Sequence, residues 1–264
     1  MSGNRPCGHA KEAVISRMLA ALEVPRDGVL MLHSSFKLFA REGYDAGATL
    51  AALIDYMAPG TLMLPTMSWR FVKPDRPLFD ELETPSNVGV LTELFRTEHA
   101  SRRSLHPTHS AAALGPRADE LLGEHHLDET PCSARSPFGR LVAADGHVVM
   151  MGIGMDCCTL IHHGEEVVAP ELYLRPVEAC ETYTCRDRHG EEHAVRLRRH
   201  LFLRRNYWQF QDRLAAAGGL RVFRCDNSTC IGFRAADMHQ VVVEALRRRP
   251  DAIVARPGQR YRMM

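Results

Sequence analysis

The chain has 264 residues, of which 45% are hydrophobic and 25% charged, the composition of an ordinary folded globular protein. Its formal net charge of +1 argues against a general nucleic-acid binder, and no apolar run approaches the roughly 20 residues that span a bilayer. We therefore expect no nucleic-acid or membrane partner and, because the first residues lack the apolar core of a signal peptide, a cytoplasmic location.

The first half of the chain alternates helical and strand-like patterns. Apolar side chains recur at helical spacing in residues 11–22, and an apolar run ending in small polar residues follows at 28–35. A short apolar run at 111–114 follows a polar segment. Between residues 35 and 102 we expect a helix at 48–57 and a buried strand at 61–66. A long surface loop at 67–86 and a helix at 87–98 should follow.

The second half contains the clearest strand, at residues 146–152, and a helix at 159–168. This alternation predicts an α/β fold with a mixed, largely parallel central sheet flanked by helices. We expect one domain over residues 1–264, with a variable excursion at about 179–220. The remaining expected elements are an antiparallel pair at 179–198, a helix at 199–219, a strand-like segment at 221–233 and a helix at 235–248.

The sharpest chemical pattern is His162 three residues before Glu165 in a predicted helix. Side chains at this spacing share a helix face. A carboxylate beside an imidazole fixes its tautomer and favours its protonated form, which suits a base that accepts a proton from an attacking amine. The same spacing arises by chance on surface helices, so the pattern alone leaves both interpretations open.

Two polar loops follow predicted strands, where the ligand sites of α/β sheets gather. His33, Ser34 and Ser35 precede Lys37, and residues 102–110 combine two arginines, two histidines and three hydroxyls. Guanidinium groups and hydroxyls bind phosphate oxygens, but such hydroxyls also often bond only their own backbone. Each loop is therefore either a phosphate site or a plain loop.

Several cofactor motifs are missing. Gly152 and Gly154 follow a strand without the third glycine of a dinucleotide site, and neither a P-loop nor a G-x-S-x-G elbow occurs. The histidines are scattered, and the cysteine pairs 180/185 and 225/230 lack the usual zinc spacing. We expect no bound metal, and we expect the cysteines to be free thiols.

Six motifs, in order, resemble the aminoglycoside 3-N-acetyltransferase family. The resemblance runs from about residue 12 to residue 178, and more loosely to about 245. The motifs are His33-Ser-Ser, Leu64-Pro-Thr66, Arg103-Ser-Leu-His-Pro-Thr-His-Ser110, Ser136-Pro-Phe-Gly-Arg-Leu141, Gly152-Ile-Gly and residues 159–166.

The resemblance implies one α/β domain that is not of the GNAT acetyltransferase type. It also implies acetyl-CoA as co-substrate, a primary amine as acceptor, and direct transfer without an acyl-enzyme. By position, His162 matches the general base and Glu165 its carboxylate partner, and no metal is implied. The expected cofactor-binding residues are Ser34, Ser35, Lys37, Thr66, Arg103, Ser104, His106 and Ser110.

The acceptor is less defined. An aminoglycoside is a polycation that needs carboxylates, and we expect Asp80 and Glu166 to bind it. However, residues 196–205 are arginine-rich where resistance-type members of the family carry acidic residues, which suits an acceptor with a phosphate or carboxylate. Another biosynthetic amine, a non-catalytic CoA-binding homologue and a metal-dependent hydrolase remain alternatives, and the protein is expected to be a monomer or homodimer.

Overall fold

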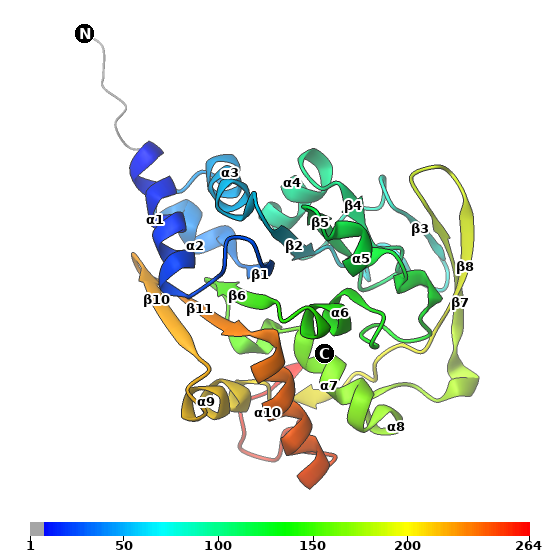
Figure 1. The fold of residues 1–264 in the computed structure, drawn as a ribbon. Helices are drawn as coiled ribbons and strands as arrows, with labels where there is room; N and C mark the ends of the chain where they lie inside the picture. The colour runs from blue at the N-terminus through cyan, green and yellow to red at the C-terminus, as the bar shows by residue number, and fades with distance from the viewer. Residues whose placement is uncertain (1–7) are drawn as a thin grey trace.

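A seven-stranded sheet forms the centre of the computed structural model, which describes residues 8–264 (Figure 1). Residues 1–7 lie outside the described residues. Two predictions fall partly on them, the single domain over residues 1–264 and the absence of a signal-peptide core. The strand order is β10-β11-β6-β1-β2-β5-β4. The strands are β1 (Val29–Ser34), β2 (Thr61–Pro65), β4 (Arg102–Arg103), β5 (Ala111–Leu114), β6 (His147–Met151), β10 (Arg221–Cys225) and β11 (Ser228–Arg234).

The sheet is mixed, as predicted, but parallel pairing is confined to its three central strands. β1 is parallel to both β2 and β6, whereas β5, β4, β11 and β10 add antiparallel strands at the two edges. Every residue of β2 and β6 is buried. Continuous apolar runs of this kind are typical of strands covered on both faces, so the predicted buried strands are confirmed.

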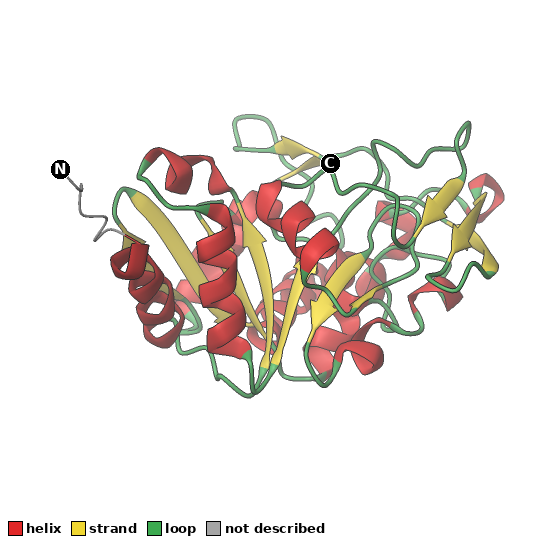
Figure 2. Cartoon of the chain, turned by 90° about the horizontal axis from the view of Figure 1, so that it is seen from above, coloured by secondary structure: helices red, strands yellow, loops and turns green. Residues whose placement is uncertain are grey.

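Helices cover both faces of the sheet (Figure 2). Those on one face share a core with Leu30, Leu62 and Val149, and those on the other share a core with Met31, Met63 and Val148. The first group is α1 (Gly8–Ala21), α2 (Phe36–Arg41), α3 (Ala46–Met57) and α4 (Val90–Glu98). The second is α5 (Ala118–Leu122), α6 (Pro137–Ala143), α7 (Leu160–Val168), α8 (Pro170–Tyr173), α9 (Trp208–Ala216) and α10 (Ala235–Arg248).

A separate three-stranded sheet lies beside the main one, with β3 (Leu78–Asp80), β7 (Glu181–Arg186) and β8 (Glu192–Leu197) (Figure 1). The antiparallel β7–β8 pair confirms the antiparallel pair predicted at residues 179–198. The prediction of a plain surface loop over residues 67–86 is wrong at β3, which pairs with β7 and buries Phe79 completely. This sheet has its own small core, which local sequence patterns do not reveal.

The helix predicted from residue 199 begins only at Trp208. The segment before it is extended, and β9 (Arg204–Arg205) pairs with β12 (Arg262–Met263) near the C-terminus. The helix predictions that correspond to α1, α3, α4, α7 and α10 are confirmed. Among residues 8–264, no helix is long and apolar enough to cross a membrane.

Gly164 lets α7 lie close to α10. A Cβ at this position would stand 2.4 Å from Val242 Cγ1. We expect Gly164→Ala to lower the free energy of unfolding by about 1–3 kcal/mol, because overpacking outweighs the gain of about 1 kcal/mol in helix propensity. Urea unfolding checks this. Gly47→Ala in α3, where the nearest atom is 3.3 Å away, is the control, and Val242→Ala should partly rescue Gly164→Ala.

Candidate active site

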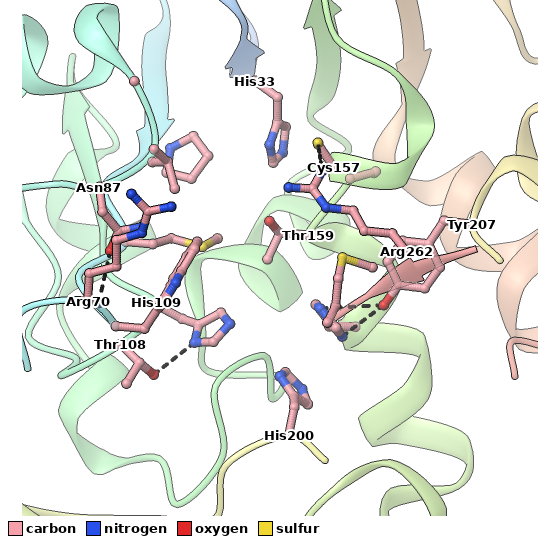
Figure 3. A pocket seen from close by; sticks show the side chains of 18 of the residues that line it. His33, Arg70, Asn87, Thr108, His109, Cys157, Thr159, His200, Tyr207 and Arg262 are labelled. Carbon is pink, nitrogen blue, oxygen red and sulfur yellow. Dashed lines mark hydrogen bonds between the residues drawn. The ribbon is translucent and has the colours of Figure 1, made fainter. Parts of the chain in front are cut away.

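A cavity of about 900 Å³ opens where the central strands end (Figure 3). Its wall includes Ser34 at the end of β1, Pro65 at the end of β2 and Ile153 just after β6. This is where ligands bind in open α/β sheets. The opposite part of the wall comes from α7 and from the extended segment before α9, which contribute His162, His200 and Tyr207.

His162 and Glu165 form a buried hydrogen-bonded pair on α7. Their spacing of three residues places both on one helix face, and His162 Nδ1 lies 2.8 Å from Glu165 Oε2. The helix ends at Val168 because Pro170 disfavours helical backbone at Ala169. The pairing predicted from the sequence is therefore present.

Tyr207 and Arg205 complete a network around this carboxylate. The Tyr207 hydroxyl donates to Glu165 Oε1 at 2.9 Å and lies 2.9 Å from His162 Nδ1. Arg205 Nε donates to Glu165 Oε1, also at 2.9 Å, and both side chains of this ion pair are fully buried. Because Nδ1–H of the neutral imidazole points at Glu165, the Nε2 lone pair of His162 is left to accept a proton.

Burial controls the protonation of His162. It lowers the imidazole pKa well below its ordinary value of 6.5, and the charge of Arg205 lowers it further. The sequence-based expectation that Glu165 favours the protonated form is wrong here, because burial and the charge of Arg205 outweigh it. The neutral imidazole is the form that acts as a base.

A second histidine–carboxylate pair lies against the first. His200 Nε2 is 2.8 Å from Glu166 Oε1, and the His200 ring stacks on His162 with centroids 4.1 Å apart. The Cys132 N–H also donates to Glu166 Oε1 at 2.8 Å. Burial raises the pKa of the Glu166 carboxyl to about 8, so this group is neutral at pH 7.

Glu166→Gln should change how stability depends on pH. The folded pKa of about 8 exceeds the ordinary 4.5, so the wild-type protein loses stability as pH rises from 4.5 to 8. Glutamine retains both hydrogen bonds without this titration. We expect the two proteins to be similar at pH 5 and the variant to be more stable at pH 8.5 by a few kcal/mol, on the order expected from linkage. Urea unfolding at both pH values checks this; equal pH dependence would contradict it.

The predicted CoA loop after β1 reaches the cavity only in part. Ser34 lines it. Ser35 is the N-cap residue of α2 and makes no side-chain capping bond. Lys37 is exposed on α2 and is not among the residues that line the cavity. Of the three residues predicted to bind the cofactor in this loop, Ser34 lines the cavity, as does the neighbouring His33.

The second predicted loop lies behind the cavity wall. Arg103 Nε contacts Thr66 Oγ1 and Ser110 Oγ, each at 3.2 Å, while Ser104 Oγ bonds His125 Nδ1 at 2.9 Å. His106 Nδ1 accepts from the N–H groups of residues 108 and 109. All five predicted side chains are buried and absent from the cavity lining, and their hydrogen bonds hold the loop, so cofactor binding by them stays a prediction. These side chains are Thr66, Arg103, Ser104, His106 and Ser110.

The two predicted acceptor-binding carboxylates do not line the cavity either. Asp80 lies in β3, where it accepts from the N–H groups of Leu82 and Glu83. Glu166 supports His200 from behind. The cavity-lining groups that were not predicted as site residues are Arg70, His109, Arg175, Arg199, His200, Tyr207 and Arg262. The arginine-rich segment at residues 196–205 gave a sequence signal for Arg199 and His200, and the polar loop at residues 102–110 gave one for His109.

Metal-binding atoms also meet at this site. Ligand atoms of His162, Glu165 and His200 lie within 4.8 Å of one another. The two rings are nearly parallel, at 18°, so their in-plane lone pairs do not converge well. The expectation that the protein uses no metal stays a prediction.

Comparisons with known proteins point to one family. The family model for aminoglycoside 3-N-acetyltransferase matches residues 31–247. Aminoglycoside N(3)-acetyltransferase IX of Micromonospora chalcea is 33% identical over 184 residues, which cover 61% of this chain and 64% of that protein. Aminoglycoside N(3)-acetyltransferase III of Pseudomonas aeruginosa is 33% identical over 163 residues, covering 55% and 59%. The match thus spans less than two thirds of the length of these relatives.

Solved structures share the fold. A mutant of the aminoglycoside acetyltransferase AAC(3)-IVa in complex with a gentamicin gives a TM-score of 0.77 at 24% identity, covering 94% of this chain and 92% of that one. AAC-IIIb, as a binary complex with CoASH, gives 0.74 at 21% identity, covering 94% and 99%. At these identities the likeness shows the fold alone.

Proposed function

Because the chain belongs to the aminoglycoside 3-N-acetyltransferase family, we propose that it transfers the acetyl group of acetyl-CoA to a primary amine, with His162 as general base. The observation that supports this most is the buried network that fixes Nδ1 of a neutral imidazole and directs the ring into the cavity. Glu165 and Tyr207 position the base, and Arg205 holds Glu165.

Direct transfer is the chemistry that this arrangement favours. The neutral amine attacks the thioester carbonyl while His162 Nε2 accepts its proton. The tetrahedral intermediate then collapses, the carbon–sulfur bond breaks, and the imidazolium returns the proton to the leaving thiolate. Backbone N–H groups in the strand-end loops would stabilise the oxyanion. No residue of the chain becomes acetylated in this scheme.

The donor and acceptor are assigned to different ends of the cavity. Ser34, at the end of β1, is a candidate for contact with the pantetheine part of acetyl-CoA. The acceptor then approaches His162 from the His200 end; Figure 3 shows His33 and His200 at opposite ends of the cavity. Aminoglycosides are the first acceptors to test, because the relatives carry their name.

Release of free thiol from acetyl-CoA tests the reaction. Purified protein is incubated with acetyl-CoA and a panel of aminoglycosides, amino sugars and amino-sugar phosphates, with and without EDTA. Amine-dependent release that survives EDTA supports the proposal. Release abolished by the chelator would favour metal chemistry, and CoA binding without release for any amine would favour a non-catalytic homologue.

The pH dependence provides a second test. Since the His162 pKa lies below 6.5, the base stays neutral through the neutral range. We expect kcat/KM with a fixed acceptor, corrected for the ionisation of its amine, to be constant near pH 7 and to fall only below pH 6.5. An acid limb centred above pH 7 would contradict the assignment of this histidine.

A further inference from the structure

The wall of the cavity carries positive side chains and no acidic side chain. Four arginines reach it, and among the residues that the structure describes no Asp or Glu lines it. The four are Arg70, Arg175, Arg199 and Arg262. A cleft for a polycation needs carboxylates, so this lining is opposite in charge to what an aminoglycoside requires.

The arginines are only partly neutralised. Arg175 and Arg199 share one carboxylate, that of Glu181, at 2.7 Å and 3.6 Å respectively. Arg262 pairs with Asp156 at 3.2 Å. Within residues 8–264, the Arg70 guanidinium has no counter-ion at ion-pair distance. The Arg175–Arg199 pair therefore leaves about one uncompensated positive charge, and Arg70 leaves another.

The carboxylates behind the base do not offset this charge. Glu165 is matched by the buried Arg205, and Glu166 is held neutral by burial. Neither side chain lines the cavity.

The Arg175–Arg199 pair stands at the acceptor end of the cavity. The Arg175 N–H donates to the carbonyl of Arg199 at 2.9 Å, and Arg199 immediately precedes His200. The His200 ring stacks on His162. A cavity ligand that touches these two arginines would therefore lie on the same side of the cavity as the base, away from the strand end assigned to acetyl-CoA.

From this charge pattern, and building on the proposed acetyl transfer, we infer that the acceptor is a small primary amine that also carries an oxyanion, bound by Arg199 and Arg175. Guanidinium groups bind phosphate and carboxylate oxygens through paired, charge-assisted hydrogen bonds. The anion would anchor the molecule at the arginines and present its amine to His162. A polycationic aminoglycoside would instead be repelled.

Binding to CoA-saturated protein tests this without turnover. Glucosamine 6-phosphate and glucosamine form a pair that differs only in the anion, 4-aminobutyrate tests a carboxylate, and gentamicin represents the polycations. Calorimetric titration should show the phosphate compound or the aminobutyrate binding at least tenfold more tightly than glucosamine and gentamicin. The stronger of the two identifies the oxyanion.

Arg199→Gln should lower the affinity for the anionic ligand about 10- to 100-fold, as expected for the loss of a charged hydrogen-bond partner. Arg196→Gln is the matched control, because Arg196 is exposed, pairs with Glu129 at 3.4 Å and does not line the cavity. CoA affinity should be unchanged in both variants.

Two results would overturn the inference. One is tighter binding of gentamicin than of either anionic amine, and the other is loss of CoA affinity in Arg199→Gln, which would assign the arginine to the CoA phosphates. Neither result depends on catalysis, whereas failure of acetyl transfer itself appears only in the thiol-release assay. The two proposals therefore fail separately.

Discussion

His162→Ala is expected to lower kcat for amine acetylation by a factor of about 10² to 10⁴, the usual contribution of general-base catalysis. The KM for acetyl-CoA should stay near the wild-type value, because the lost group acts on the acceptor amine. Removing the ring also takes away the hydrogen bond to Glu165 Oε2, while Arg205 and Tyr207 still donate to Oε1. Thiol release under saturating acetyl-CoA measures the effect.

His163→Ala is the matched control for this prediction. His163 is the next residue on α7 and is also buried, but its Nδ1 bonds the Cys132 carbonyl at 2.7 Å and its ring lies outside the cavity lining. We expect His163→Ala to lower the free energy of unfolding but to leave the kcat of the folded protein near the wild-type value. A wild-type kcat in His162→Ala, or an equal loss in both variants, would remove His162 from the base role.

The sequence predicted the part of the site that is local in the chain. His162 and Glu165 lie one helical turn apart, so their contact follows from helix geometry once α7 is recognised. Tyr207 and Arg205 approach the same carboxylate from residues about forty positions later. Their segment resembles a helix in composition, and its extended form depends on pairing with β12. Tertiary contacts of this kind leave no periodic pattern.

Residue type was a weaker guide in the loop before β5. Arg103 and its neighbouring hydroxyls suit a phosphate, yet in the fold they connect β4, β2 and the three-stranded sheet. The Arg103 guanidinium lies over the Phe79 ring, 4.6 Å from its centroid. The same polar side chain can bond either a ligand or a buried backbone group. Whether it meets one or the other depends on whether the fold buries it. Here Phe79 of β3 covers Arg103, and β3 was not predicted from the sequence.

Arg205→Met is expected to lower the free energy of unfolding by about 3–5 kcal/mol, because it leaves the Glu165 carboxylate buried without its cation. Both side chains are 0% exposed, so water cannot replace the lost partner. The guanidinium also donates to the carbonyls of Leu201 and Met264, which ties the extended segment to the C-terminus. Urea unfolding measures the loss. Arg204→Met, at the exposed neighbouring position, should stay within about 0.5 kcal/mol of wild type.

The double variant Glu165→Gln/Arg205→Met separates charge from packing. If the uncompensated carboxylate causes most of the loss, replacing it with a neutral amide should recover part of the stability, and the two substitutions should be strongly non-additive. The two carbonyls still lose their donor, so recovery should be incomplete. A double variant no more stable than Arg205→Met would mean that Arg205 acts through the segment it anchors.

In a folded Arg205→Met protein the acid limb of kcat/KM should also move to higher pH, because Arg205 no longer lowers the pKa of His162.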